Sequence, residues 1–382
     1  MTRLPDWNPK SQEVLRDQCA AYDQMRRDCP VAYSEMLGWS LFRHQDIVRV
    51  LEDHATFSSR VSKHLSVPNG MDPPEHTKFR SLVEPLFRPA AMAAFEPKCR
   101  AIASELLKDI APGCEVEFIA EYAQPFAVRA QCESLGWHAE MYEPLRLWTC
   151  KNQQATFAQD RAAMAQVAQE FDGYTAELLR HRRENEATNE HDAIASLLEA
   201  RVDGRPLRDE ELVSILRNWT VGEIGTISAA VGILAHFLAS DLQTQTTLRE
   251  DPATIPLAIE EILRVHGPLV ANRRVTTCPV QIGGRTIEAG ERVSLNWISA
   301  NRDEGVFEEP YTVRLDRDPS QNLLYGAGIH ACPGAPLARL EMRVALEELL
   351  GRTQQLVCNP DVPPTLLTFP ASGFDTLPLI VN

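Results

Sequence analysis

The sequence has no long apolar run, no excess of basic residues and no paired-cysteine motif. Its longest apolar stretch, 227–240, contains His236 and is shorter than the roughly 20 residues that span a bilayer, so we expect a buried helix there. Lys and Arg number 38 against 53 Asp and Glu, a net charge of −15, which argues against nucleic acid or an anionic membrane as partner. The nine cysteines show no CxxC or metal-finger spacing, which favours a reducing cytoplasm.

The chain also shows no repeat, no low-complexity segment and no linker rich in Pro, Gly or Ser. Its first residues are polar and contain proline, without the charged-then-apolar order of a signal peptide or an anchor. Length alone favours two or three domains. Because nothing in the composition marks a boundary, we instead predict a single domain over residues 1–382, in the cytoplasm.

Helical patterns dominate the chain, so we predict a mainly α fold with a small β portion. A highly charged segment, 181–192, is expected to be a solvated loop. Short β-branched runs with glycine turns predict strands within 31–43 and a small sheet within 268–300. The predicted helices cover 11–28, 74–87, 91–110, 160–183, 209–238, 253–265 and 337–350.

One segment, residues 325–334, surrounds a single cysteine with three glycines. Gly326, Gly328 and Gly334 flank Cys332, and glycine permits a close backbone approach or a positive φ. Cys332 lies just before a predicted helix, where the N–H groups and the helix dipole favour a thiolate. A thiolate is a strongly electron-donating axial ligand of haem iron. The alternative, a free cysteine in a glycine-rich turn, applies to the other eight cysteines, which have no such surroundings.

This segment resembles the cysteine loop of the cytochrome P-450 family, Phe-Gly-x-Gly-x-His-x-Cys-x-Gly. It differs in having Tyr325 in place of Phe, and Pro333 directly after the cysteine. The resemblance runs from about Asp72 to the C-terminus, and implies a helix-rich fold that encloses haem b with Cys332 as the iron ligand. Proline has no N–H, so we expect Pro333 to leave the sulfur one donor short. It is alternatively a simple first residue of a helix.

Two further patterns resemble landmarks of the same family. Glu261 and Arg264 are spaced i, i+3 on a predicted helix, like the family's structural Glu-x-x-Arg pair, and Arg314 is the expected third member of this ion-pair group. Without the family pattern, such a pair is an ordinary surface salt bridge of little energetic weight. The stretch 301–303, Asn-Arg-Asp, matches the family's Ala-Asn-Arg-Asp segment.

The resemblance also assigns partners to the two haem propionates, which need cations or hydrogen-bond donors when partly buried. His76 and Arg80, spaced i, i+4 in the segment that begins at Asp72, occupy the family's haem-edge helix. Arg274 and His330 are the other two expected partners, although Arg273 directly precedes Arg274. The alternative for each residue is a solvated surface position.

The predicted oxygen-binding helix is unusual. The family places an acid directly before a threonine above the haem; here Thr226 is at the alcohol position, but Gly225 is at the acid position. Glu223, one turn earlier on the same face, is the candidate replacement. The alternative is an ordinary helix in which Thr226 is buried and Glu223 is exposed. Gly222 and Gly225 both disfavour helix, which suits a backbone that approaches a cofactor closely.

The resemblance implies a monooxygenase that inserts one oxygen atom from O₂ into a small or medium organic substrate. Electrons would come from a separate ferredoxin-type donor with an NAD(P)H-dependent reductase, since no flavin, nucleotide or iron–sulfur motif is present. The displaced acid leaves a hydrogen-peroxide-driven peroxygenase open, and a non-catalytic haem sensor is a third possibility. Substrate contacts are expected within 62–71, 148–157, 218–222, 268–270 and 372–374; nothing narrower about the substrate follows.

Overall fold

The computed structural model describes residues 4–108, 110, 112–184, 192–369 and 371–382. Helices make up most of this part of the chain, as the sequence predicts. They are α1 (Gln12–Arg16), α2 (Gln18–Asp28), α3 (His44–Glu52), α4 (Glu75–Val83), α5 (Pro89–Leu106), α6 (Gln124–Leu135), α7 (Tyr142–Ala158), α8 (Arg161–Glu184), α9 (Ala193–Glu199), α10 (Asp209–Ser240), α11 (Leu242–Glu250), α12 (Ile255–Val265), α13 (Trp297–Ala300) and α14 (Ala335–Arg352).

The strands form one mixed sheet and several small antiparallel ones. The largest sheet has the order β1-β2-β10-β7-β3, in which β10 pairs parallel with β2 and antiparallel with β7. The strands are β1 (Val31–Ser34), β2 (Gly38–Leu41), β3 (Phe57–Ser58), β4 (Cys114–Glu117), β5 (Arg201–Val202), β6 (Arg205–Pro206), β7 (Ala271–Thr276), β8 (Val280–Ile282), β9 (Arg285–Ile287), β10 (Arg292–Asn296), β11 (Leu356–Cys358), β12 (Thr365–Leu366), β13 (Phe374–Thr376) and β14 (Pro378–Val381).

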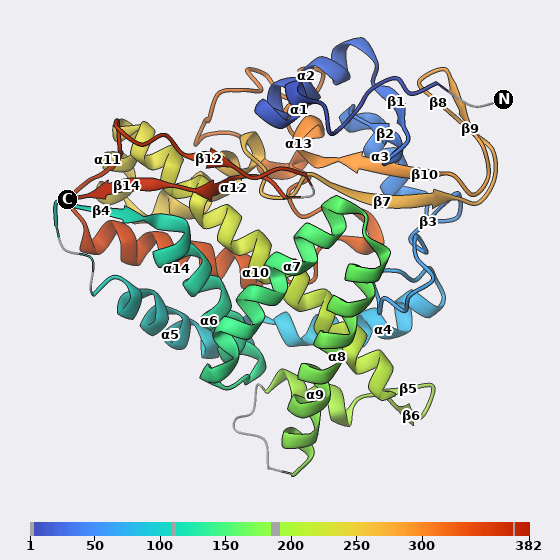
Figure 1. The fold of residues 1–382 in the computed structure, drawn as a ribbon, viewed down its shortest axis with the longest axis horizontal. Coiled ribbons are helices and arrows are strands. Elements are labelled where there is room, and N and C mark those ends of the chain that lie inside the picture. Colours follow the sequence, from blue (N-terminus) through green and yellow to red (C-terminus); the bar gives the residue numbers. More distant parts are fainter. Residues whose placement is uncertain (1–3, 109, 111, 185–191, 370) are drawn as a thin grey trace.

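Helix α10 crosses the centre of the molecule, between the mixed sheet with α1–α3 and the helices α5, α6 and α14 (Figure 1). Its second half, the apolar stretch 227–240, is mostly buried in the main core with α5, α6, α12 and α14. By length and composition α10 could cross a membrane. Burial of its apolar half inside the protein accounts for the same composition, as expected from the sequence.

Two predicted elements differ from the structure. The helix expected over 11–28 is divided at Asp17, whose carboxylate accepts a hydrogen bond from Ala20 N and caps α2. The loop expected over 181–192 is wrong in its first part, because α8 continues to Glu184. Basic side chains in that last turn suit the negative end of the helix dipole. Residues 185–191 lie outside the described residues. The last residue of the segment, Asp192, is buried and caps α9 (Ala193–Glu199), so the prediction of a solvated loop is wrong there too.

The predicted ion pair on α12 is present and buried, but its third member is a different arginine. Arg264 donates to both carboxylate oxygens of Glu261, at 2.8 and 2.9 Å. Arg317 Nε donates to Glu261 Oε1 at 2.8 Å. The expected Arg314 contributes only its backbone N–H, at 3.1 Å, while its side chain pairs with Asp316 on the surface.

We predict that Arg317→Ala lowers the free energy of unfolding by roughly 1.5–3 kcal/mol, the range for a hydrogen bond to a charged group. The loss follows because Glu261 is buried and keeps one fewer cationic partner. Arg314→Ala is the matched control and should unfold like the wild type. Thermal unfolding of both variants decides the assignment, and greater damage from Arg314→Ala would reverse it.

Candidate active site

The cysteine loop ends at the start of α14. Cys332 N donates to Tyr325 O at 2.8 Å, which closes the loop, and the short 3-10 helix Gly328–His330 lies within it. Gly328 has φ +67°, and a Cβ there would lie 2.5 Å from the backbone oxygen of Leu51 on α3. Glycine at this position therefore follows from both its φ and its contact with α3.

The Cys332 sulfur lies where two backbone N–H groups at the α14 start face it. The surrounding protein raises the pKa of the Cys332 thiol, while the N–H groups of Gly334 and Ala335 and the Arg80 guanidinium act in the opposite direction. Pro333 supplies no N–H, but the two residues after it do. The expectation that Pro333 leaves the sulfur short of donors is therefore weakened, because the donors come from the next two positions. The alternative, a first residue of the helix, is not met either, since α14 begins at Ala335 with Gly334 as its N-cap.

Two histidines from distant parts of the chain lie side by side at this loop, with their ring planes tilted by 55°. His76 on α4 and His330 in the loop have ring centroids 4.3 Å apart. The Nε2 atom of each is buried and has no hydrogen-bond partner among the described residues. Burial, together with the nearby Arg274 and His76, lowers the pKa of His330 to about 3, and burial and Arg80 lower that of His76.

The two predicted arginines approach the same place from α4 and β7. Arg80 donates to Ala331 O at 2.6 Å, inside the cysteine loop, and to Glu84 at 2.7 Å. Arg274 is 8% exposed and donates to the backbone oxygen of Arg273; burial lowers its pKa. Within the described ranges this is the one hydrogen-bond partner of the buried guanidinium. Beside two imidazole nitrogens that also lack partners there, it forms a site for an anionic group. Two carboxylates on the edge of a porphyrin fit this donor set.

On α10, Gly222 and Thr226 have different surroundings from Gly225. A Cβ added at Gly222 would meet no atom within 4 Å, whereas one at Gly225 would lie 3.0 Å from the Gln153 amide nitrogen on α7. Gly222 and Thr226 are spaced i, i+4 and share a face of the helix. Gly225, where the family has its acid, therefore faces α7, and Gln153 occupies the space that a side chain there would need. Thr226 lies on the face of α10 that has open space beside Gly222.

Glu223, the proposed replacement acid, is an i, i+3 neighbour of Thr226 on α10. Its carboxyl faces the Gln131 amide on α6 and the carboxyl of Glu341 on α14. Burial raises the pKa of Glu223 to about 8. Glu341 and Gln131 were not among the predicted site residues. An acid inside the apolar run 337–350 was the signal that could have indicated Glu341.

The predicted substrate-contact segments lie together along α10. Asn218 donates to Val67 O at 3.0 Å and contacts Ser66 Oγ at 3.3 Å, so the segment 62–71 is tied to the first half of the helix. The segment 148–157 meets Gly225 through Gln153, and Gly373 approaches Ala229 O. Leu269 forms a bridge with Ala371. The Asn218 amide, expected as a polar substrate contact, is instead engaged by the protein.

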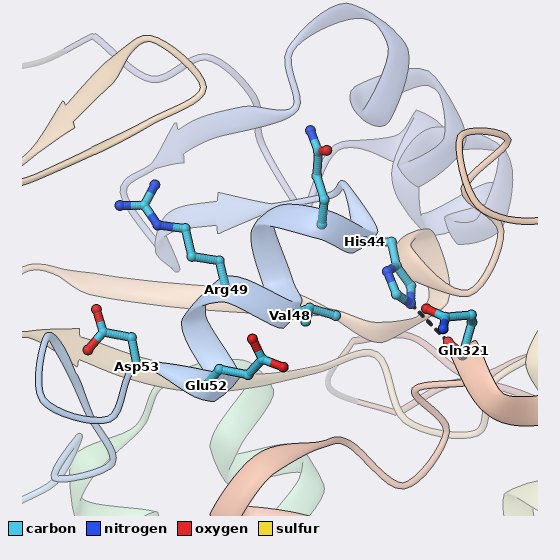
Figure 2. A pocket seen from close by; sticks show the side chains of 7 residues that line it. His44, Val48, Arg49, Glu52, Asp53 and Gln321 are labelled. Carbon is cyan, nitrogen blue, oxygen red and sulfur yellow. Dashed lines mark hydrogen bonds between the residues drawn. The ribbon is translucent and has the colours of Figure 1, made fainter.

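A separate hollow of about 470 Å³ lies on the outer side of α3 (Figure 2). The side chains of His44, Val48, Arg49 and Glu52 line it, and His44 Nε2 lies 2.9 Å from Gln321 O. None of the predicted site residues lines this hollow. Neither His76 nor His330 lines it, and it carries no part of the candidate site.

Comparisons with known proteins agree with this geometry. The sequence model of the cytochrome P-450 family matches residues 141–381. The erythromycin C-12 hydroxylase of Saccharopolyspora erythraea is 34% identical over 366 residues, 91% of this chain and 90% of that protein. The cyclomarin C epoxidase of Salinispora arenicola is 33% identical over 350 residues, 87% of this chain and 88% of that protein.

Solved structures give the same result. A mutant of P-450 EryK in complex with erythromycin B has a TM-score of 0.88 at 30% identity, covering 96% of each chain. A cytochrome P-450 from Bacillus megaterium in complex with corticosterone has a TM-score of 0.85 at 28% identity, over 97% of this chain and 99% of that one.

Fold and site together define a haem-thiolate protein. The chain belongs to the cytochrome P-450 family. It binds haem b and is a monooxygenase that acts on an organic substrate with O₂, as its hydroxylase and epoxidase relatives are named.

Proposed function

We propose that Cys332 is the iron ligand and that His76, Arg80, Arg274 and His330 hold the two propionates. The observation that carries this proposal is the pair of buried, unpartnered Nε2 atoms beside Arg274 and the cysteine loop. The protein alone gives these donors no acceptor, and each unsatisfied buried group costs about 1–3 kcal/mol. Two carboxylates at this place would remove that cost.

Bound haem supplies the reductive activation of O₂, and the residues around it supply orientation and protons. The Cys332 thiolate would donate charge to the haem iron, and the N–H groups of Gly334 and Ala335 would tune that charge. The Thr226 hydroxyl positions a proton on the face of α10 that also carries Gly222. Glu223, one turn earlier, is the acid that replaces the one missing at Gly225.

The partners and the location are proposals of the same kind. Electrons come from a ferredoxin-type donor with an NAD(P)H-dependent reductase, and the protein acts in the cytoplasm. The named substrates of the relatives and neighbours, among them erythromycin and corticosterone, support a medium-sized organic substrate. The Asn218 amide, expected to contact the substrate, is bonded to Val67 O and Ser66 Oγ, which removes one polar group from the contact surface.

We predict that Arg274→Leu releases haem about 10 to 100 times faster than the wild type, since a lost hydrogen bond to a charged group costs roughly 1.5–3 kcal/mol. Arg273→Leu is the matched control: neighbouring residues of a strand point to opposite faces, so this variant should retain haem normally. The rate of haem transfer to excess apomyoglobin measures both. If haem is lost faster from Arg273→Leu alone, Arg273 rather than Arg274 binds the propionate.

We predict that Thr226→Ala lowers the product formed per NAD(P)H consumed by at least about tenfold, because a positioned proton donor contributes about 10²–10⁴-fold. The missing electrons should appear as hydrogen peroxide, and Thr226→Ser should restore most of the coupling. The assay measures NAD(P)H, O₂, peroxide and product with a ferredoxin and its reductase. Unchanged coupling would remove Thr226 from the proton path, and turnover with peroxide alone would support a peroxygenase.

A further inference from the structure

Gly225 leaves a space on α10 that a side chain from α7 occupies. The glycine is at the position where the family carries its acid, directly before Thr226. The atom nearest to a Cβ added at Gly225 is Nε2 of Gln153, at 3.0 Å, and the next is Cγ2 of Thr149, at 3.8 Å. Both come from α7, which packs against α10 (Figure 1). The Gln153 amide therefore lies where the side chain of the family's acid would begin.

This contact means that Gln153 and an acid at position 225 exclude each other. A separation of 3.0 Å is already shorter than the distance of about 3.5–4.0 Å at which non-bonded carbon atoms pack best. An aspartate at this position would add a carboxylate beyond the Cβ. The space holds either a side chain from α10 or the amide from α7, so the glycine and the glutamine are two parts of one feature.

The Gln153 amide is not engaged by the protein. It makes no hydrogen bond with any other residue that the structure describes, although the side chain is half-buried. Its polar neighbours on α7 are engaged: Thr149 donates to Leu145 O at 2.9 Å, and Thr156 donates to Asn152 O at 2.8 Å. An amide offers two N–H donors and an oxygen acceptor, and leaving them unused away from bulk water costs free energy. A water molecule would remove that cost.

The Thr226 hydroxyl is unengaged in the same way. A threonine inside a helix commonly donates to the carbonyl four residues earlier, and Thr220 on α10 does so, to Leu216 O at 2.9 Å. Thr226 makes no hydrogen bond through its hydroxyl within the described ranges. Its face of α10 also carries Gly222, where an added Cβ would meet no atom within 4 Å. Two unused polar groups therefore lie at consecutive positions of α10, beside open space.

Glu223 does not fill the place at Gly225. Its carboxyl faces the Gln131 amide on α6 and the Glu341 carboxyl on α14. Even with Glu223 as the source of protons, the site needs a polar group that holds water next to Thr226. A neutral amide suits this place, because burying it costs much less than burying an ionised carboxylate. It can orient water but cannot supply a proton.

We propose that Gln153 is a positioning residue of this site: its amide takes the place of the family's acid side chain and holds a water molecule beside the Thr226 hydroxyl. The inference rests on the proposed role of Thr226 and deepens it. The amide only donates and accepts hydrogen bonds, and no covalent bond forms or breaks at it. The two tasks of the family's acid are thereby divided between Glu223 on α10, which holds the proton, and Gln153 on α7, which holds the water.

Infrared spectroscopy of the ferrous, carbon-monoxide-bound protein tests this role without substrate or turnover. A hydrogen-bond donor beside bound carbon monoxide lowers its C–O stretching frequency. Gln153→Met keeps the length of the side chain but removes its polar atoms, so the C–O band should move to higher frequency and lose its shift in D₂O. Gln154→Met, at the next and exposed position of α7, is the matched control and should match the wild type. An unchanged band in Gln153→Met, or an equal change in Gln154→Met, overturns the proposal.

Moving the amide from α7 to α10 tests whether the two positions share one space. Gly225→Asn alone should lower the thermal midpoint, because its side chain meets the Gln153 amide. In Gln153→Ala/Gly225→Asn the amide returns from the other helix. The midpoint should then recover, and the C–O band should return from its position in Gln153→Ala toward that of the wild type. Effects of the two substitutions that simply add contradict a shared space.

Gly225→Ala is the second variant if Gly225→Asn fails to fold, since it adds only the Cβ that lies 3.0 Å from the amide. Its thermal effect is compared between the wild type and Gln153→Ala, so that the higher helix propensity of alanine cancels. The substitution should be more favourable when Gln153 is absent. Equal effects in both backgrounds contradict the exclusion of one side chain by the other.

A double variant tests whether Gln153 and Thr226 hold the same water. Thr226→Val should raise the C–O frequency as Gln153→Met does. Because the water needs both partners, Thr226→Val/Gln153→Met should shift the band by less than the sum of the single shifts. A shift equal to that sum would mean that the two residues act separately, and the proposal would be wrong.

The same samples separate this proposal from the function on which it rests. If the wild type lacks the long-wavelength Soret band of a haem thiolate, ligation by Cys332 and the proposed function fail. If that band is present and the C–O stretch responds to Thr226→Val but not to Gln153→Met, Thr226 keeps its role. Gln153 is then a packing residue between α7 and α10, and only the positioning role is overturned.

Discussion

The position of the Cys332 sulfur at the start of α14 is the constraint on which the rest of the structure depends. Several long-range contacts fix the loop that carries this sulfur. Gly328 packs against the Leu51 backbone of α3, and Arg80 of α4 donates into the loop at Ala331. Upstream, Asn301 accepts from Leu323 N and Arg264 donates to Asn301 O. The buried Glu261–Arg264 pair of α12 therefore helps to hold Asn301, which in turn holds the chain just before the cysteine loop.

Polar groups are buried on two sides of the site, beside the cysteine loop and beside α10. On the loop side, the Nε2 atoms of His76 and His330 have no partner in the described part of the chain, and the buried Arg274 guanidinium donates to one backbone oxygen there, which suits an anionic cofactor edge. On the α10 side, the carboxyls of Glu223 and Glu341 have no cation beside them among the described residues. Buried hydrogen-bond donors therefore suit an anion on one side, and burial favours the protonated acids on the other. Each set would destabilise the fold if the group it serves were neutral and apolar.

The sequence predicted those features that depend on local pattern. The glycine spacing around Cys332, the pairing of Glu261 with Arg264 and the helices at the ends of the chain follow from residues near one another. Helices α3, α6, α7, α9 and α11 were missed. In α6 and α7 the polar and apolar residues do not separate into two clear faces, and α3, α9 and α11 are short. The choice of Arg317 over Arg314 depends on how a surface loop folds back onto α12, and the meeting of Gln131, Glu223 and Glu341 depends on three helices packing together. Such contacts have no signature in the order of the residues.

The reduced, carbon-monoxide-bound spectrum tests the central claim, thiolate ligation by Cys332, most directly. The wild type and the control Cys114→Ser, an exposed cysteine, should show the long-wavelength Soret band of a haem thiolate. Cys332→Ser should lack that band, because serine offers the iron no thiolate. Survival of the band in Cys332→Ser would show that another residue binds the iron and would contradict this account.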